Sequence, residues 1–156
     1  MTLRVVGLLR VLLVLAFGCV LLAQVLAVPA SLTYVADRSP ELAYLRWPVT
    51  VVAAAGLLCV EVVIVATWKL LTMVKHDRIF SDASTRWLDV IVWSVAVAWV
   101  LVVGLFAYFV RWGLSGLPAL LLLMVVAGAV LGLLLVVVRA LLRQATTLRT
   151  DMEAVI

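Results

Sequence analysis

The sequence predicts an all-α integral membrane protein: a four-helix antiparallel transmembrane bundle whose fourth helix extends into the cytoplasm. Of the 156 residues, 68% are apolar and only 13% are charged, whereas soluble domains have roughly half and a quarter. The mean hydropathy is +1.34. Because 12 basic and 8 acidic side chains could not cover so much apolar surface in water, the lipid bilayer is the first predicted partner.

Four apolar runs are long enough to cross about 30 Å of hydrocarbon, which takes about 20 helical residues. They cover residues 11–28, 49–67, 88–110 and 119–138. Since lipid offers the backbone no hydrogen-bond partners, each run must be helical. The four runs leave little chain outside the membrane, so residues 1–156 are expected to form a single membrane domain.

The first run has two interpretations. Arg4 and Arg10 precede it, and Val28–Ala30 at its end could be cut by a signal peptidase. However, the uncharged stretch Val11–Ala36 is longer than the 7–15-residue core typical of a signal peptide. A retained first span is therefore favoured over a cleaved signal peptide.

The segment between the first two spans is expected to be a loop from Pro29 to Pro48. Within it, Ser39 is a suitable N-cap and Pro40 suits the first turn of a helix. A short interfacial helix, Pro40–Arg46, is therefore predicted.

The distribution of basic residues predicts the orientation. Cytoplasmic loops carry an excess of Lys and Arg, so the side with more of them is expected to face the cytoplasm. Three of the twelve lie on one side (Arg38, Arg46, Arg111), and nine lie on the other (Arg4, Arg10, Lys69, Lys75, Arg78, Arg86, Arg139, Arg143, Arg149). We expect a multi-pass protein of the bacterial cell membrane with both termini in the cytoplasm.

The cytoplasmic loop at residues 75–87 is predicted to be ordered and to contribute to a partner-binding surface. Ser81 is a good N-cap for the third long helix, and Phe80 is placed to anchor the turn through apolar contact. His76 is the only histidine, which excludes bis-histidine haem ligation and a two-histidine metal site on one chain.

Residues 139–156 are predicted to form a cytoplasmic amphipathic helix that continues the fourth span. Its apolar residues recur in steps of three and four, which is the a/d pattern of a heptad seam. The seam comprises Val138, Leu141, Ala145, Leu148, Met152 and Val155. Because so short a helix is not stable alone, the seam is expected to cover a partner: the cytoplasmic loop, the membrane surface, a second copy in a homodimer, or another protein.

Glu61 is the one acidic residue near the middle of a span, and a carboxylate at that depth is a functional candidate by default. Trp99 of the third span is expected at a matching depth, where its indole N–H could donate to Glu61. Three roles stay open for Glu61: a neutral residue that fixes helix packing, a proton-coupled or substrate-binding carboxylate, and a contact to a partner chain.

Two further pairs lie inside the spans. Cys19 and Cys59 are expected at a shared depth on antiparallel helices, where they could touch. Gly128 and Gly132 form a GxxxG pair, which favours close helix contact.

Enzymatic chemistry is not predicted. The sequence contains no nucleotide-binding loop, no nucleophile with a base and no zinc-ligand spacing. No catalytic residue, cofactor or metal is therefore expected. The basic residues flank apolar runs and form no single patch, so direct nucleic-acid binding is not expected either.

Two cytoplasmic motifs carry a resemblance to a known family. Arg78–Ala83 followed by Arg86–Asp89, and the ending Leu142–Ile156, resemble the bacterial four-span family called domain of unknown function 2975, in its actinobacterial form. Its members are often encoded beside a short Cro-type helix-turn-helix regulator, so the resemblance implies a membrane sensor or anti-repressor that holds such a regulator. It implies no catalytic residue. The family's usual final acidic pair is Glu153-Ala154 here.

The sequence therefore predicts a non-enzymatic membrane protein that docks a partner, such as a small helix-turn-helix regulator, on its cytoplasmic face. The predicted docking residues are Phe80, Ser81, Leu141, Ala145, Leu148, Met152 and Val155. The alternative is a small dimeric proton-coupled exporter that uses Glu61 as its exchanging carboxylate.

Overall fold

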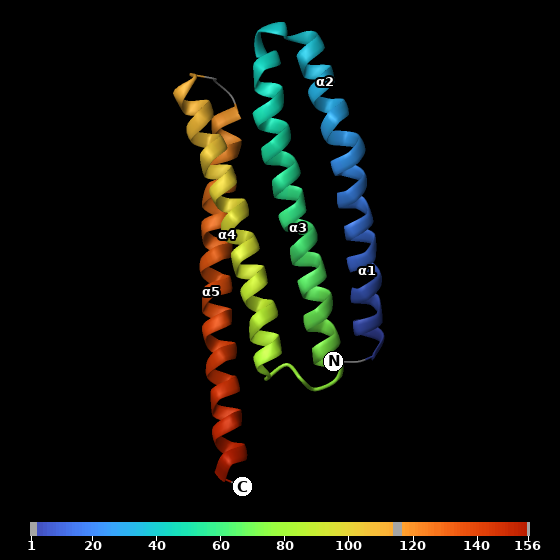
Figure 1. Cartoon of the computed structure of the whole chain (residues 1–156), viewed down its shortest axis with the longest axis vertical. Coiled ribbons are helices and arrows are strands. Elements are labelled where there is room, and N and C mark those ends of the chain that lie inside the picture. Colours follow the sequence, from blue (N-terminus) through green and yellow to red (C-terminus); the bar gives the residue numbers. More distant parts are fainter. Residues whose placement is uncertain (1–2, 114–116, 156) are drawn as a thin grey trace.

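The computed structural model describes residues 3–113 and 117–155 and consists of long helices joined by short turns. Figure 1 shows the helices side by side, with both termini toward the same end. Four helices are long and apolar enough to cross a membrane, and the described residues contain no strand. The predicted all-α membrane fold is confirmed.

The first membrane helix is continuous from Leu3 to Arg38. It consists of α1 (Leu3–Leu22), a π-helical turn η1 (Ala23–Ala27) and α2 (Val28–Arg38). The prediction of a loop beginning at Pro29 was wrong. Proline lacks an N–H and its ring crowds the carbonyl four residues earlier, and the wider π turn just before it lets the helix continue.

The connection to the second membrane helix is correspondingly short. Ser39 is followed by the 3₁₀ helix η2 (Pro40–Leu45), which leads directly into α3 (Arg46–Lys75). The predicted short helix after Ser39 is present, although with 3₁₀ geometry. Ser39 makes no side-chain cap hydrogen bond.

The remaining helices are α4 (Asp82–Arg111) and α5 (Leu117–Val155). Each predicted span lies inside one long helix, and the helices continue past the apolar runs. The 39 residues of α5 measure about 58 Å at 1.5 Å per residue, about twice the hydrocarbon thickness. The predicted extension of the fourth helix is therefore present as far as Val155, and Ile156 lies outside the described residues.

The helices pack in the order in which they occur along the chain. The first membrane helix packs on α3, α3 on α4, and α4 on α5, and within residues 3–113 and 117–155 α5 packs on α4 alone. Ala66, Leu88 and Ile91 form a cluster of buried apolar residues. Leu135 and Leu142 of α5 pack against it. Because Ala66 is fully buried and small, α3 and α4 can approach closely there.

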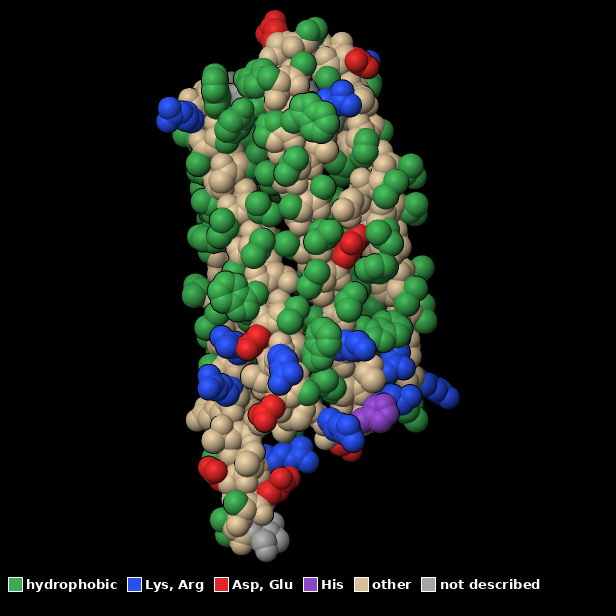
Figure 2. Space-filling model, in the orientation of Figure 1, with side chains coloured by type: hydrophobic (Ala, Val, Ile, Leu, Met, Phe, Trp, Pro, Cys, Tyr) green, Lys and Arg blue, Asp and Glu red, His purple; other side chains and the backbone are tan. Residues whose placement is uncertain are grey.

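Charged side chains gather at the end of the molecule that carries both termini. Figure 2 shows most Lys and Arg side chains in the lower part of the view, below a largely apolar surface. We call this end, formed by residues 3–10, 69–86 and 139–155, the basic end.

Candidate functional site

The turn between α3 and α4 at the basic end is ordered by backbone geometry. Asp77 adopts a positive φ of 54°, a conformation that aspartate tolerates better than most residues. The Arg78 amide donates to the Met73 carbonyl at 2.9 Å. His76 donates from Nδ1 to the Thr72 carbonyl at 2.9 Å, so its ring is held against α3.

Ser81 occupies the predicted N-cap position of α4, but its side chain does not cap the helix. Its hydroxyl instead donates back to the Arg78 carbonyl at 2.7 Å. Ser84, which the sequence analysis did not select, is fully buried and donates to the carbonyls of Ser81 and Ile79. Two serine hydroxyls therefore hold the turn in place before α4 begins.

Phe80 connects this turn to α5. Its ring is 42% exposed, and the Arg149 guanidinium lies over it at 5.8 Å from the ring centroid. Arg149 also forms an ion pair with Glu153, with Nε and Oε1 3.5 Å apart. Phe80 was predicted to anchor the turn through apolar contact, whereas the contact found here is a cation–π contact with Arg149 of α5.

The face of α5 that packs against the bundle differs from the predicted seam. Leu135, Leu142 and Arg149 make the contacts described above, and Thr146 on the same side is 8% exposed. These residues recur in steps of three, four and seven, so they line one side of the helix. The sequence feature that could have identified the packing face is this second heptad line, in which a threonine and an arginine replace apolar residues.

The predicted seam lies about 100° around the helix from that contact line, because each of its leucines precedes a contact residue by one position. Leu141 and Leu148 are about 60% exposed, and Val155 is 88% exposed. Met152 is also exposed, whereas Ala145 is half-buried. Within the described residues, the chain therefore leaves most of its seam uncovered.

An ion pair that the sequence analysis did not anticipate joins α4 to α5. Arg139 Nε contacts the Asp89 carboxylate, and both side chains are more than half buried. Asp89 stands at the start of the predicted third span, and Arg139 directly follows the predicted fourth. The pair thus marks the level at which the apolar part of both helices ends.

The indole N–H of Trp99 does not donate to Glu61. Its indole Nε1 donates to the Val125 carbonyl of α5 at 2.8 Å. A Cβ placed on Gly128 would lie 2.6 Å from Trp99 Cδ1, whereas one on Gly132 would have no atom within 4 Å. The predicted Trp99–Glu61 hydrogen bond was wrong: the indole N–H donates to a backbone carbonyl instead, and helical spacing does not reveal such an acceptor. Of the predicted GxxxG pair, Gly128 alone is needed for this close approach.

Glu61 lies on α3 and is partly buried. Its Oε1 and the Gln24 Oε1 are both buried without a hydrogen-bond partner among the described residues. Arg10 donates to Thr72 Oγ1 at 3.3 Å, which sets the antiparallel register of α1 and α3. Counting eleven residues from each places Glu61 beside Leu21, within one turn of Gln24 and of η1. Gln24 was not selected from the sequence.

The two cysteines do not pair. Cys59 lines grooves beside α4, whereas Cys19 is exposed on α1. Across residues 3–113 and 117–155, no group of three or more His, Cys, Asp and Glu side chains could hold a metal ion. What the arrangement offers is a surface at the basic end and two buried polar side chains, Glu61 and Gln24, inside the membrane helices.

A comparison with known families gives one match. The model of a family described as a protein of unknown function (DUF2975) matches residues 31–156. No curated protein and no solved structure matches the chain. The matched region includes both motifs that carry the resemblance, the turn before α4 and the extension of α5, whereas α1 precedes it.

Proposed function

The chain belongs to the DUF2975 family, and we propose that it is a non-enzymatic membrane protein that docks a partner protein on the cytoplasmic face of the membrane. The proposed docking surface consists of Phe80 and Ser81 of the turn and the seam residues of α5. The proposed partner is a small helix-turn-helix regulator, held at the membrane as a sensor or anti-repressor would hold it.

The orientation in this proposal follows from charge. Nine of the twelve Lys and Arg residues lie at the basic end. An excess of this size favours a cytoplasmic location for the basic end under the positive-inside rule. With that orientation, the docking surface and both termini face the compartment in which transcriptional regulators act.

The uncovered seam is the observation that carries the proposal. Leu148, Met152 and Val155 are all more than half exposed, and they lie beyond the Asp89–Arg139 pair that marks the end of the apolar helices. Aligned apolar side chains outside the membrane are typical of surfaces that receive an amphipathic helix. A small helix-turn-helix protein presents such helices.

The test is binding of the purified full chain to a small helix-turn-helix regulator of the Cro type. Leu148→Asp places a charge at the centre of the seam, and we expect it to abolish binding. Thr147→Asp adds the same charge at the neighbouring exposed position, about 100° away on the helix, and is expected to leave binding within twofold. Calorimetry on both variants and the unaltered chain measures the difference.

Equal losses in Leu148→Asp and Thr147→Asp would contradict docking through the seam. Binding that survives in Leu148→Asp would contradict it as well. Retained thermal stability of both variants in detergent is the control for folding.

A second candidate function is proton-coupled export by a dimer. It is favoured by the unpartnered Glu61 Oε1 at membrane depth, because an exchanging carboxylate must be free to gain and lose a proton. Loss of drug efflux in Glu61→Gln, at normal protein level, would support this function. Unchanged efflux between Glu61→Gln and the unaltered chain would exclude it.

A further inference from the structure

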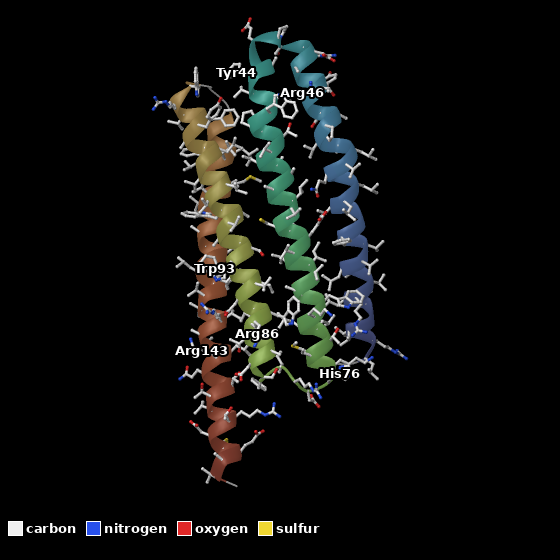
Figure 3. All side chains as sticks on the ribbon, viewed as in Figure 1. Tyr44, Arg46, His76, Arg86, Trp93 and Arg143 are labelled. Carbon is white, nitrogen blue, oxygen red and sulfur yellow. The ribbon has the colours of Figure 1, made fainter. Side chains whose placement is uncertain are left out.

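A groove of about 400 Å³ runs between α3 and α4, separate from the proposed docking surface. Its apolar lining includes Leu58 and Val62 of α3 and Val90, Trp93 and Val97 of α4. Trp93 is 71% exposed, so its ring faces whatever surrounds the helices at this depth. Figure 3 shows Trp93 and Arg86 on the same part of α4.

Charged residues line the groove only where it approaches the basic end of the molecule. Arg86 and Asp89 line that part of it. Asp89 is neutralised by its ion pair with Arg139 of α5, whereas Arg86 is exposed and forms no ion pair among the described residues. Farther along, the Ser94 hydroxyl donates to the Val90 carbonyl at 2.8 Å. One uncompensated cation therefore stands at one end of an otherwise apolar groove.

The length of the groove matches one leaflet of a bilayer. Arg86 and Val97 are eleven residues apart, or about 16 Å along the helix. Half of the hydrocarbon core is about 15 Å thick. Arg86 precedes Asp89 by less than one turn, and the Asp89–Arg139 pair marks the end of the apolar helices. The cation is thus at headgroup level when the apolar lining is at acyl-chain level.

We propose that this groove binds one anionic phospholipid of the leaflet at the basic end. Its phosphate contacts the Arg86 guanidinium, whose planar N–H groups suit phosphate oxygens. One acyl chain lies along Val90, Trp93 and Val97. Basic residues at the rim of a groove between membrane helices are a recurrent way of binding anionic lipids.

A second groove shows why charge decides this assignment. It is lined by residues of α3, α4 and α5, among them Val63, Ala98 and Leu131, and has a similar volume of about 440 Å³. No Lys, Arg, Asp or Glu lines it. It therefore offers nothing that would distinguish one headgroup from another.

Native mass spectrometry of the full chain in detergent, titrated with phosphatidylglycerol or phosphatidylcholine of identical acyl chains, tests the proposal. We expect one phosphatidylglycerol to bind more tightly than phosphatidylcholine. Arg86→Gln should weaken it about fivefold, equivalent to about 1 kcal/mol for one interfacial cation. Arg86→Lys, which keeps the charge, should lose less.

Two controls separate the groove from general attraction to the basic end. Arg143→Gln removes an equal charge from α5, outside this groove, and should leave the affinity unchanged. Val97→Trp, at an exposed position, should fill the deep end of the groove and weaken binding although Arg86 is intact.

Equal losses in Arg86→Gln and Arg143→Gln would overturn the proposal in favour of diffuse charge attraction. Equal binding of the two lipids would overturn headgroup recognition. Full competition by glycerol 3-phosphate, which has no acyl chain, would show a phosphate site without a lipid groove. Thermal unfolding of each variant in the same detergent establishes that a loss of lipid is not a loss of fold.

Discussion

The indole ring of Trp99 on α4 occupies the space that a side chain at position 128 of α5 would require. A Cβ at Gly128 would lie 2.6 Å from Trp99 Cδ1, and the Trp99 Nε1 hydrogen bond to Val125 holds the ring in that position. The contact between α4 and α5 therefore depends on the absence of a side chain at one residue.

Gly128→Ala should destabilise the packing of α5 on α4. The added methyl group forces the indole or the helix to shift, and overpacking of this kind costs about 1–3 kcal/mol. The variant is expected to unfold at a lower temperature in detergent, with altered Trp fluorescence because the hydrogen bond to Val125 is strained.

Gly132→Ala is the matched control, because nothing lies within 4 Å of a Cβ there. Both substitutions gain the same helix propensity, so the difference between them isolates the contact with Trp99. Equal stability of the two variants would contradict the proposed role of Gly128.

Truncation of α5 should be tolerated at one point and disruptive at another. A chain ending at Thr150 keeps Arg139, Leu142 and Thr146, which contact or pack against the bundle, and should insert and unfold like the full chain. A chain ending at Val138 loses all three and should give much less folded protein. Size-exclusion profiles in detergent measure both outcomes.

The removal of the residues after Thr150 also tests the docking surface. A chain ending at Thr150 lacks Met152 and Val155, half of the exposed apolar residues of the seam beyond Val138. It should therefore bind the regulator more weakly while remaining folded. Undiminished binding would restrict the docking surface to residues 80–148.

Substitutions at Glu61 test whether folding requires an uncharged side chain at this position. Glu61→Gln keeps the shape and the hydrogen-bonding capacity, so the folding yield should barely change. Glu61→Lys forces a cation near mid-membrane at a cost of about 2.5–3.5 kcal/mol, and folded protein should decrease sharply. A comparable yield for the two variants in a membrane-fraction assay would show that the side chain reaches water.

Topology is expected to follow the charge distribution. Reporter fusions after Ile156 and between residues 75 and 80 should report a cytoplasmic location, and a fusion at Ser39 should report the opposite side. A reporter signal from outside the cytoplasm at Ile156 would overturn the orientation and, with it, docking of a cytoplasmic regulator.

The helices could be predicted because the polar backbone groups of an apolar run find no hydrogen-bond partners in lipid and must pair within a helix. Runs such as residues 88–110 therefore carry their own structure. The continuation of the first helix through Pro29 could not be predicted in the same way. It depends on the π turn at Ala23–Ala27, which adds one residue to a turn of the helix. The amino-acid composition of this segment does not indicate such a turn.

The contacts between helices were predicted less well than the helices themselves. Periodicity identified an apolar line through Leu141 and Leu148, yet α5 packs through the line one residue later, at Leu142 and its heptad neighbours. The contact line carries Thr146 and Arg149, so hydrophobic periodicity favoured the more apolar line through Leu141 and Leu148. The pairing of Arg139 with Asp89 depends on how α5 is rotated about its own axis relative to α4. The spacing of residues within one helix does not determine that rotation.

The order in which the helices pack has a consequence for how the protein is made. Because each membrane helix packs on the one synthesised just before it, every newly inserted helix meets its neighbour already in the bilayer. Packing between helices that are not consecutive in the chain is then not required at any stage. We expect each hairpin of two helices to be in place before the ribosome has finished the next, with the extension of α5 closing against the turn at Phe80 as the last step.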